Sequence, residues 1–318
     1  MKKEKSFNKS TVLRDYGLVI IFLVVVIILA IVTPTFRKPM NLLNVIKQAS
    51  VNGILAFGMM IVVITGGIDL SMGSIVGFAG VCAALFAHPG EYPLIVPIVI
   101  ALIAGGAIGF INGVGVSYGN LPPFIITLGT MSIARGLALV FSGGVPVIDM
   151  SESFVAIASG SLFGIPYLSY YFIGIALIFA FVLNKLVFGR HVYMIGGNKI
   201  AAKVSGINVK LNLLVVYTLS GLCSGLAGFL MASRTNQGSP TMGVSYEMDA
   251  VTAVVIGGVS MSGGAGKWYG VVIGALFIAV IENALTIFGV DPNWKQVVKG
   301  VIIIGAVLLD VKSKGKKE

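Results

Sequence analysis

Residues 94–116 read LIVPIVIALIAGGAIGFINGVGV and contain no charged side chain. A helix of about 20 apolar residues is long enough to cross the hydrocarbon core of a bilayer. The chain of 318 residues is 57% hydrophobic and only 11% charged, whereas a soluble domain carries roughly a quarter charged residues. Three further charge-free runs have similar character: Tyr16–Val32, Tyr167–Asn184 and Leu211–Ser233. This pattern indicates an all-α, polytopic membrane protein.

The apolar segments number about ten, which predicts about ten transmembrane helices, one or two of them broken or re-entrant. The segments are 16–33, 51–65, 74–87, 94–116, 124–142, 167–187, 211–233, 248–259, 268–286 and 297–311. An even number of crossings returns both termini to one side of the membrane. We expect residues 1–318 to form a single transmembrane domain in the cytoplasmic membrane.

Basic residues indicate which side that is, because cytoplasmic loops carry an excess of Lys and Arg. The cations cluster at Lys2–Arg14, Lys185–Lys210 and Lys312–Lys317. This predicts a cytoplasmic N-terminal tail (1–15), a cytoplasmic loop (188–210) and a basic cytoplasmic C-terminal tail (312–318). The 143–166 loop then lies outside. Three basic residues do not fit this arrangement, because it places them outside: Arg37, Lys38 and Lys47.

Two glycine-rich stretches interrupt the apolar pattern. GGIDLSMGS occupies 66–74 and SMSGGAGK occupies 260–267, each between short apolar runs. Short apolar halves around a polar break are typical of discontinuous helices in transporters. A tight turn between two helices explains the same pattern, and both interpretations stay open. In either case the backbone should leave the helical conformation there.

Small residues recur every four positions in three segments, which places them on one helix face. Such faces let helix backbones approach closely in lipid. We interpret them as packing inside the bundle rather than as a dimer seam. They are Ala101, Gly105, Gly109 and Gly113; Gly221 and Gly225; and Gly270 and Gly274.

Nothing in the chain predicts an enzyme, a resident metal or a cofactor. It has two cysteines and two histidines, without a ligand spacing. GGAGKW (263–268) resembles a phosphate-binding loop, but the earlier glycine and the following Ser or Thr are missing. The net charge of +10 lies in the clusters described above and is not interleaved with aromatic residues, so nucleic acid is not an expected partner.

Ionisable residues inside apolar segments are costly and are candidates for function. Asp69 can cap the following helix or contact substrate, and Arg135 needs a partner such as Glu282 or a backbone carbonyl. Other polar side chains are candidates for interhelical hydrogen bonds: Asn112, Asn283 and Thr127.

The 189–210 stretch, GRHVYMIGGNKIAAKVSGINVK, is a polar, basic island. Asn198 can cap a short helix and Gly206 can end it. Ile200 and Val204 form its apolar side, with Lys199 and Lys203 four residues apart on its polar side. Such a helix can insert into a groove of another protein or lie on anionic lipid.

Several long motifs, in order, resemble the integral-membrane permease subunits of bacterial ABC importers of the ribose, galactose and xylose class. The resemblance covers residues 42–310. The motifs are GGIDLSMGS (66–74), NGVGVSYGNLPPFIITLGTMSIARGLALVFSGG (112–144), GRHVYMIGGNKIAAKVSGINV (189–209), YEMDAVTAVVIGGVSMSGGAGK (246–267) and WKQVVKGVIIIGAVLLD (294–310).

That resemblance implies a homodimer, a cytoplasmic ATPase with two nucleotide-binding halves and an extracytoplasmic sugar-binding protein. It also implies that the 188–210 loop holds the ATPase-coupling helix, where Ile200 replaces the acidic residue usual in the family. The implied coupling residues are Gly197, Asn198, Ala201, Ala202, Lys203, Ser205 and Gly206. We expect Ala202 to lie at the ATPase interface. The alternative function is an ion- or proton-coupled secondary transporter that uses Asp69, Arg135 and Glu282.

Overall fold

The computed structural model describes residues 9–314, so the two expected basic tails, 1–15 and 312–318, lie partly outside the described residues. Apart from one small hairpin, its regular structure is helical, because a helix satisfies its backbone hydrogen bonds within one segment. The hairpin pairs β1 (Ser161–Leu162) with β2 (Ile165–Pro166). The helices are α1 (Lys9–Val32), α2 (Pro39–Ile64), α3 (Met72–Leu85), α4 (Ile95–Ser117), α5 (Pro123–Ser142), α6 (Glu152–Ser159), α7 (Tyr167–Lys185), α8 (Val187–Gly197), α9 (Lys199–Val204), α10 (Val209–Thr235), α11 (Tyr246–Ile256), α12 (Trp268–Ile287) and α13 (Pro292–Lys314).

Within residues 9–314, six helices are long and apolar enough to cross a membrane: α2, α4, α5, α7, α10 and α12. Shorter apolar helices occupy Gly17–Val32 and Met72–Leu85. The prediction of an all-α membrane protein is confirmed. The count of about ten crossings stays a prediction.

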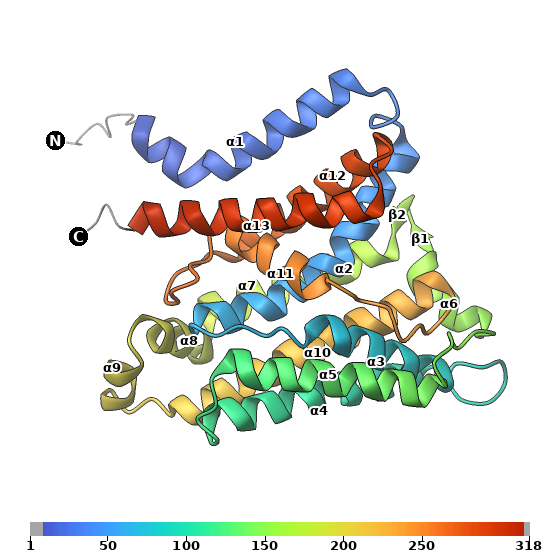
Figure 1. The fold of residues 1–318 in the computed structure, drawn as a ribbon, viewed down its shortest axis with the longest axis horizontal. Helices are drawn as coiled ribbons and strands as arrows, with labels where there is room; N and C mark the ends of the chain where they lie inside the picture. Colours follow the sequence, from blue (N-terminus) through green and yellow to red (C-terminus); the bar gives the residue numbers. More distant parts are fainter. Residues whose placement is uncertain (1–8, 315–318) are drawn as a thin grey trace.

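Helices α2 and α10 lie at the centre of the bundle (Figure 1). The second half of α2, from Ala49 to Ile64, is buried along its whole length. Helices α3 and α4 pack on α10, while α7, α11 and α12 pack on α2. A helix apolar on all sides is the expected core element of such a bundle.

The α4–α10 contact is made by glycine. A Cβ added at Gly105 would overlap the carbonyl oxygen of Gly221, and one at Gly221 would overlap the carbonyl of Gly105. Gly270 and Gly274 likewise lie against carbonyls of α11. These faces pack inside the chain, as predicted from their spacing.

The first break is a non-helical segment inside the bundle. Residues 66–71 are not helical, and Asp69 and Ser71 are fully buried. Helix α3 begins at Met72, so the break is shorter than the predicted 66–74 and residues 72–74 are helical. With 14 residues at 1.5 Å each, α3 is too short to cross a bilayer by itself.

The second predicted break, 260–267, is also non-helical, but it lies in the turn between α11 and α12. The Gly264 amide donates to the Ile64 carbonyl at 2.9 Å, which ties this turn to the end of α2. A second non-helical segment, 236–245, precedes the short helix α11 and is partly buried. A Cβ at Gly73 would overlap the Gly243 carbonyl, so the two interrupted segments meet.

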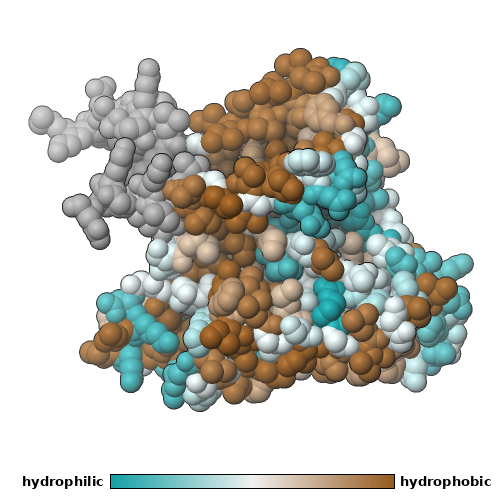
Figure 2. All heavy atoms as spheres, viewed as in Figure 1, coloured by the Kyte–Doolittle hydropathy of each residue, from teal (hydrophilic) through white to brown (hydrophobic). Residues whose placement is uncertain are grey.

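Helices α8 and α9 lie at the same end of the molecule as the start of α1 and the end of α13 (Figure 1). Helix α6 and the β1–β2 hairpin lie at the opposite end. Figure 2 shows hydrophobic residues over α1 and along α4 and α5, with hydrophilic residues at the α9 end and at the opposite end. Large exposed apolar surfaces of this kind suit a lipid environment.

Candidate functional site

Helix α9 begins and ends as its sequence predicts, with Asn198 as its N-terminal cap and Gly206 after its last turn. The Asn198 side chain accepts hydrogen bonds from the amides of Ile200 at 3.0 Å and Ala201 at 2.9 Å. Such a cap satisfies amides that have no partner within the helix. The chain then leaves the helix through Gly206, whose φ of +81° favours glycine.

Helix α9 exposes two large apolar side chains beside its lysines. Ile200 is 78% exposed and Val204 is 84% exposed, one helical turn apart. Ala202 is only 1% exposed and lies inside this chain. The expectation that Ala202 lies at an ATPase interface stays a prediction, and within this chain its small side chain lets α9 pack onto its own protein. Ile200 and Val204 are the large apolar side chains that α9 exposes.

Helix α8 links α9 to both glycine-rich breaks. A Cβ at Gly196 would overlap the Ile64 carbonyl, at the end of α2 where the 66–71 segment begins. The Tyr193 hydroxyl donates to the Gly266 carbonyl at 2.8 Å. Burial raises the pKa of Tyr193 above its usual range, so the hydroxyl stays protonated and keeps this hydrogen bond at physiological pH.

Asp69 belongs to a buried hydrogen-bond network. Its carboxylate accepts from the Ser71 amide at 3.1 Å and from the Ser220 hydroxyl at 2.6 Å. Asn112 donates to the Ser71 hydroxyl at 2.9 Å, and the Thr130 hydroxyl donates to the Asn112 carbonyl oxygen at 2.6 Å. The network joins the 66–71 segment to α4, α5 and α10. Of the two predicted roles for Asp69, these contacts favour the structural one.

Arg135 of α5 holds the 236–245 segment. Its guanidinium donates to the carbonyl of Pro240, to that of Met242 at 3.0 Å and to that of Gly73 at 3.4 Å. Of the two partners predicted for Arg135, the structure has backbone carbonyls and not Glu282. Glu247 is the nearby carboxylate.

Glu282 of α12 instead pairs with Lys299 of α13 and accepts from Gln48 of α2. Lys299 also pairs with Asp249 of α11 at 2.9 Å. Sequence reasoning missed Asp249 and Lys299, which lie near the edges of their apolar segments. Their positions inside segments 248–259 and 297–311 are the signal that could have found them.

Two of the predicted interhelical hydrogen-bond residues make such bonds and one does not. Asn112 joins the Asp69 network, and Asn283 exchanges two hydrogen bonds with Asn41, at 2.8 and 2.9 Å. The Thr127 hydroxyl donates at 2.8 Å to Pro123 in its own helix. The prediction for Thr127 is therefore wrong, and Thr130, one turn later, makes the contact.

Asp69, Arg135 and Glu282 lie in three different sets of contacts. No hydrogen bond between described residues joins one set to another. Within the described ranges, no three His, Cys, Asp or Glu side chains gather as a metal site.

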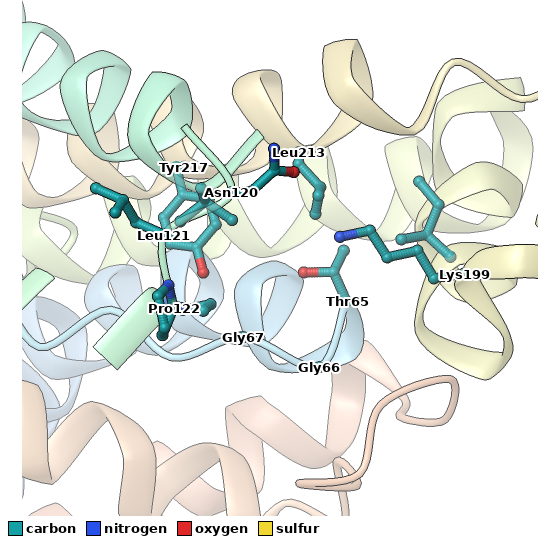
Figure 3. Close-up of a pocket in the computed structure, with 12 residues that line it drawn as sticks. Thr65, Gly66, Gly67, Asn120, Leu121, Pro122, Lys199, Leu213 and Tyr217 are labelled. Atoms are coloured by element: carbon teal, nitrogen blue, oxygen red, sulfur yellow. The ribbon is translucent and has the colours of Figure 1, made fainter. Parts of the chain in front are cut away.

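A cavity of about 370 Å³ lies between α9 and the first break. Its walls come from Thr65–Gly67, the α4–α5 turn at 120–123, the end of α8 and the start of α10. In Figure 3 the Lys199 amine points into this space from one side, with the hydroxyls of Thr65 and Tyr217 facing it. The Tyr217 hydroxyl is buried and has no hydrogen-bond partner among the described residues.

Comparison with known proteins shows the family to which the chain belongs. The family described as the branched-chain amino acid transport system / permease component matches residues 41–307. The chain belongs to this family. Together with its six apolar helices, this makes it a multi-pass protein of the inner membrane and a subunit of a transport system.

The names of individual relatives are more specific than the description of the family. The ribose import permease protein of Bacillus subtilis (strain 168) is 40% identical over 317 residues, covering 98% of this chain and 97% of the relative. The galactose/methyl galactoside import permease protein of Escherichia coli (strain K12) is 40% identical over 334 residues, covering 99% and 98%. The ribose import permease protein of the same strain is 38% identical and covers 96% of each chain. No solved structure matches the chain.

Proposed function

We propose that this chain is the pore subunit of an ATP-driven importer for a monosaccharide or a related small polyol. The observation that carries the proposal is near-full-length similarity to relatives named as ribose and galactose import permeases. The chain itself lacks a phosphate-binding loop, so ATP hydrolysis belongs to a separate chain.

The partners of this pore subunit follow from the same reasoning. We infer a homodimer of the 1–318 permease domain, a cytoplasmic ATPase with two nucleotide-binding halves and an extracytoplasmic sugar-binding protein. The exposed Ile200 and Val204 suit the ATPase contact, because a short amphipathic helix can place such side chains in a groove. To the expected coupling residues we add this exposed apolar pair as a contact. The expected residues are Gly197, Asn198, Ala201, Ala202, Lys203, Ser205 and Gly206.

The same proposal orients the chain with α9 and both termini in the cytoplasm, after ten crossings. Two crossings would each combine a non-helical segment with a short helix: 66–71 with α3, and 236–245 with α11. A Lys199→Cys variant should resist an impermeant thiol reagent in intact cells, and Phe163→Cys at the opposite end should react. The native cysteines, Cys82 and Cys223, are both buried. Labelling of Lys199→Cys from outside would contradict this orientation.

A displacement of α9 can be transmitted to the interior of the bundle through direct backbone contact. Gly196 lies against the end of α2, where the 66–71 segment begins, and that segment carries Asp69 into the buried network. Packed interiors transmit displacement because they have little free volume. Closure of an ATPase on α9 would therefore act on the interrupted crossing that includes α3.

Reconstitution tests the proposal. Uptake of ribose or galactose into proteoliposomes should require this chain, its ATPase, its binding protein and ATP. Ile200→Asp or Val204→Asp should weaken ATPase binding by tenfold or more, because burying a large apolar side chain contributes about 1.5–3 kcal/mol. Phe163→Asp, at the opposite end and 91% exposed, is the matched control. Uptake by this chain alone, driven by a proton gradient, would overturn the proposal.

A further inference from the structure

A basic recess lies beside the coupling helix. Two cavities, of about 370 and 350 Å³, share Asn120, Lys199 and Leu213 in their walls. Their combined lining includes three lysines and no carboxylate. Ligand sites in proteins typically measure about 300–1,000 Å³, so each cavity has room for a small molecule.

The cations of this recess have no acidic partner. Among the described residues, no carboxylate pairs with the amine of Lys199 or Lys203. Lys210, from the start of α10, lies over the Tyr118 ring at 5.3 Å from its centroid. Three cations from two helices around one space create a positive potential that attracts anions.

The other end of the recess is polar and incompletely paired. The Tyr217 hydroxyl is buried, lines the cavity and lacks a hydrogen-bond partner in the described part of the chain. A buried hydroxyl without a partner is destabilising, and a ligand hydroxyl would satisfy it. Thr65 and Asn120 add further polar groups to the same wall (Figure 3). This end suits hydroxyl groups, whereas the lysine end suits an anion.

We propose that this recess binds a phosphate ester, with Lys199, Lys203 and Lys210 holding the phosphate and Tyr217 meeting a hydroxyl group of the ligand. Phosphorylated sugars and phospholipid headgroups share this chemistry. The ligand would bridge α9 and the start of the 66–71 segment, so its binding would fix the two elements relative to each other. Because the inference rests on the proposed import of a sugar, the class of reaction that supplies the soluble ligand is phosphoryl transfer to the imported sugar. Accumulated sugar phosphate would then slow further import.

The test uses this chain in complex with its ATPase, in nanodiscs of phosphatidylcholine, with D-ribose 5-phosphate as the probe. Calorimetry should show binding that weakens at least about tenfold in Lys199→Gln, the loss expected for one charge-assisted hydrogen bond. Tyr217→Phe should weaken binding of the same probe, because it removes only the hydroxyl. Lys185→Gln removes an exposed cation outside the recess and should leave the affinity unchanged.

Two further arms separate the sources of the ligand. We compare the ATPase rate at saturating probe with the rate without probe. The ratio of the two rates should be below one in the parent complex and close to one in Lys199→Gln. If the occupant is lipid, nanodiscs containing phosphatidylglycerol should compete with the probe, and the parent complex should retain more phosphatidylglycerol than Lys199→Gln. Binding that survives Lys199→Gln overturns the proposal, as does the absence of lysine-dependent binding of both probe and lipid.

Uptake measured on the same preparations separates this inference from the proposed function. ATP-driven sugar uptake without lysine-dependent binding of phosphate esters overturns only the recess. Lysine-dependent binding without any ATP-driven uptake supports the recess and counts against the import role.

Discussion

Lys299 offers the clearest test of how the interior is held together. Its amine joins Asp249 of α11 to Glu282 of α12, and the Lys299 side chain is 22% exposed against 3% for Asp249. Lys299→Met keeps much of the apolar stem but leaves two carboxylates close together without a cation. The change should destabilise the α11–α12–α13 contact and leave the distant α4–α10 contact intact.

The expected loss in free energy of unfolding follows from the burial of the Lys299, Asp249 and Glu282 side chains. Removing one partner of a buried ion pair typically costs about 3–5 kcal/mol. Because the Lys299 side chain keeps some exposure, we expect the low end, about 3 kcal/mol. Replacing all three groups by neutral ones, in Lys299→Met/Asp249→Asn/Glu282→Gln, removes the unpaired charges. That variant should recover to within about 1 kcal/mol of the parent.

The assay is SDS titration of the protein in mixed micelles, followed by tryptophan fluorescence, which gives the free energy of unfolding. Lys295→Met on the same helix is the matched control, because Lys295 makes only an exposed hydrogen bond with Thr286. Surface changes of this kind usually stay within about 0.5 kcal/mol. If Lys299→Met lowers the free energy of unfolding no more than Lys295→Met, the argument for a structural ion cluster fails.

Three other variants test separate contacts. Gly221→Val should lower the free energy of unfolding by about 1–3 kcal/mol in the same titration, because its side chain would overlap a carbonyl of α4; Gly136→Val, with open space around it, should not. Arg135→Met should increase hydrogen exchange in segment 236–245, and unchanged protection there would contradict its anchoring role. Tyr193→Phe removes the hydrogen bond to Gly266 and should reduce uptake per ATP hydrolysed without loss of ATPase binding.

Local features of the chain were predictable because their physical cause is local. Asn198 caps α9 with its own following amides, and Gly206 ends that helix through its positive φ. The α4–α10 glycine face was likewise predictable as internal packing, because residues four apart share a helix face. The partner helix was not predictable from that spacing.

The orientation of α9 and the identity of the interior segment were not predictable. In a helix of six residues, periodicity alone does not show which side faces the protein, and it was Ala202 that turned inward. Segment 236–245, rich in glycine, serine and proline, has the composition of an ordinary loop. Its position is held by Arg135, about a hundred residues earlier, which donates to its carbonyls.

The amino-acid sequence by itself determined the class of protein, the helical segments and the positions of the glycine-rich breaks. Charge-free runs of this length require lipid, and glycine tolerates the backbone conformations of a break, so both properties belong to the residues themselves. Only the tertiary structure decided which break lies inside the bundle, which cation pairs with Glu282 and which face of α9 is free. These outcomes depend on burial and on partners far apart in the chain, and folding alone brings those partners together.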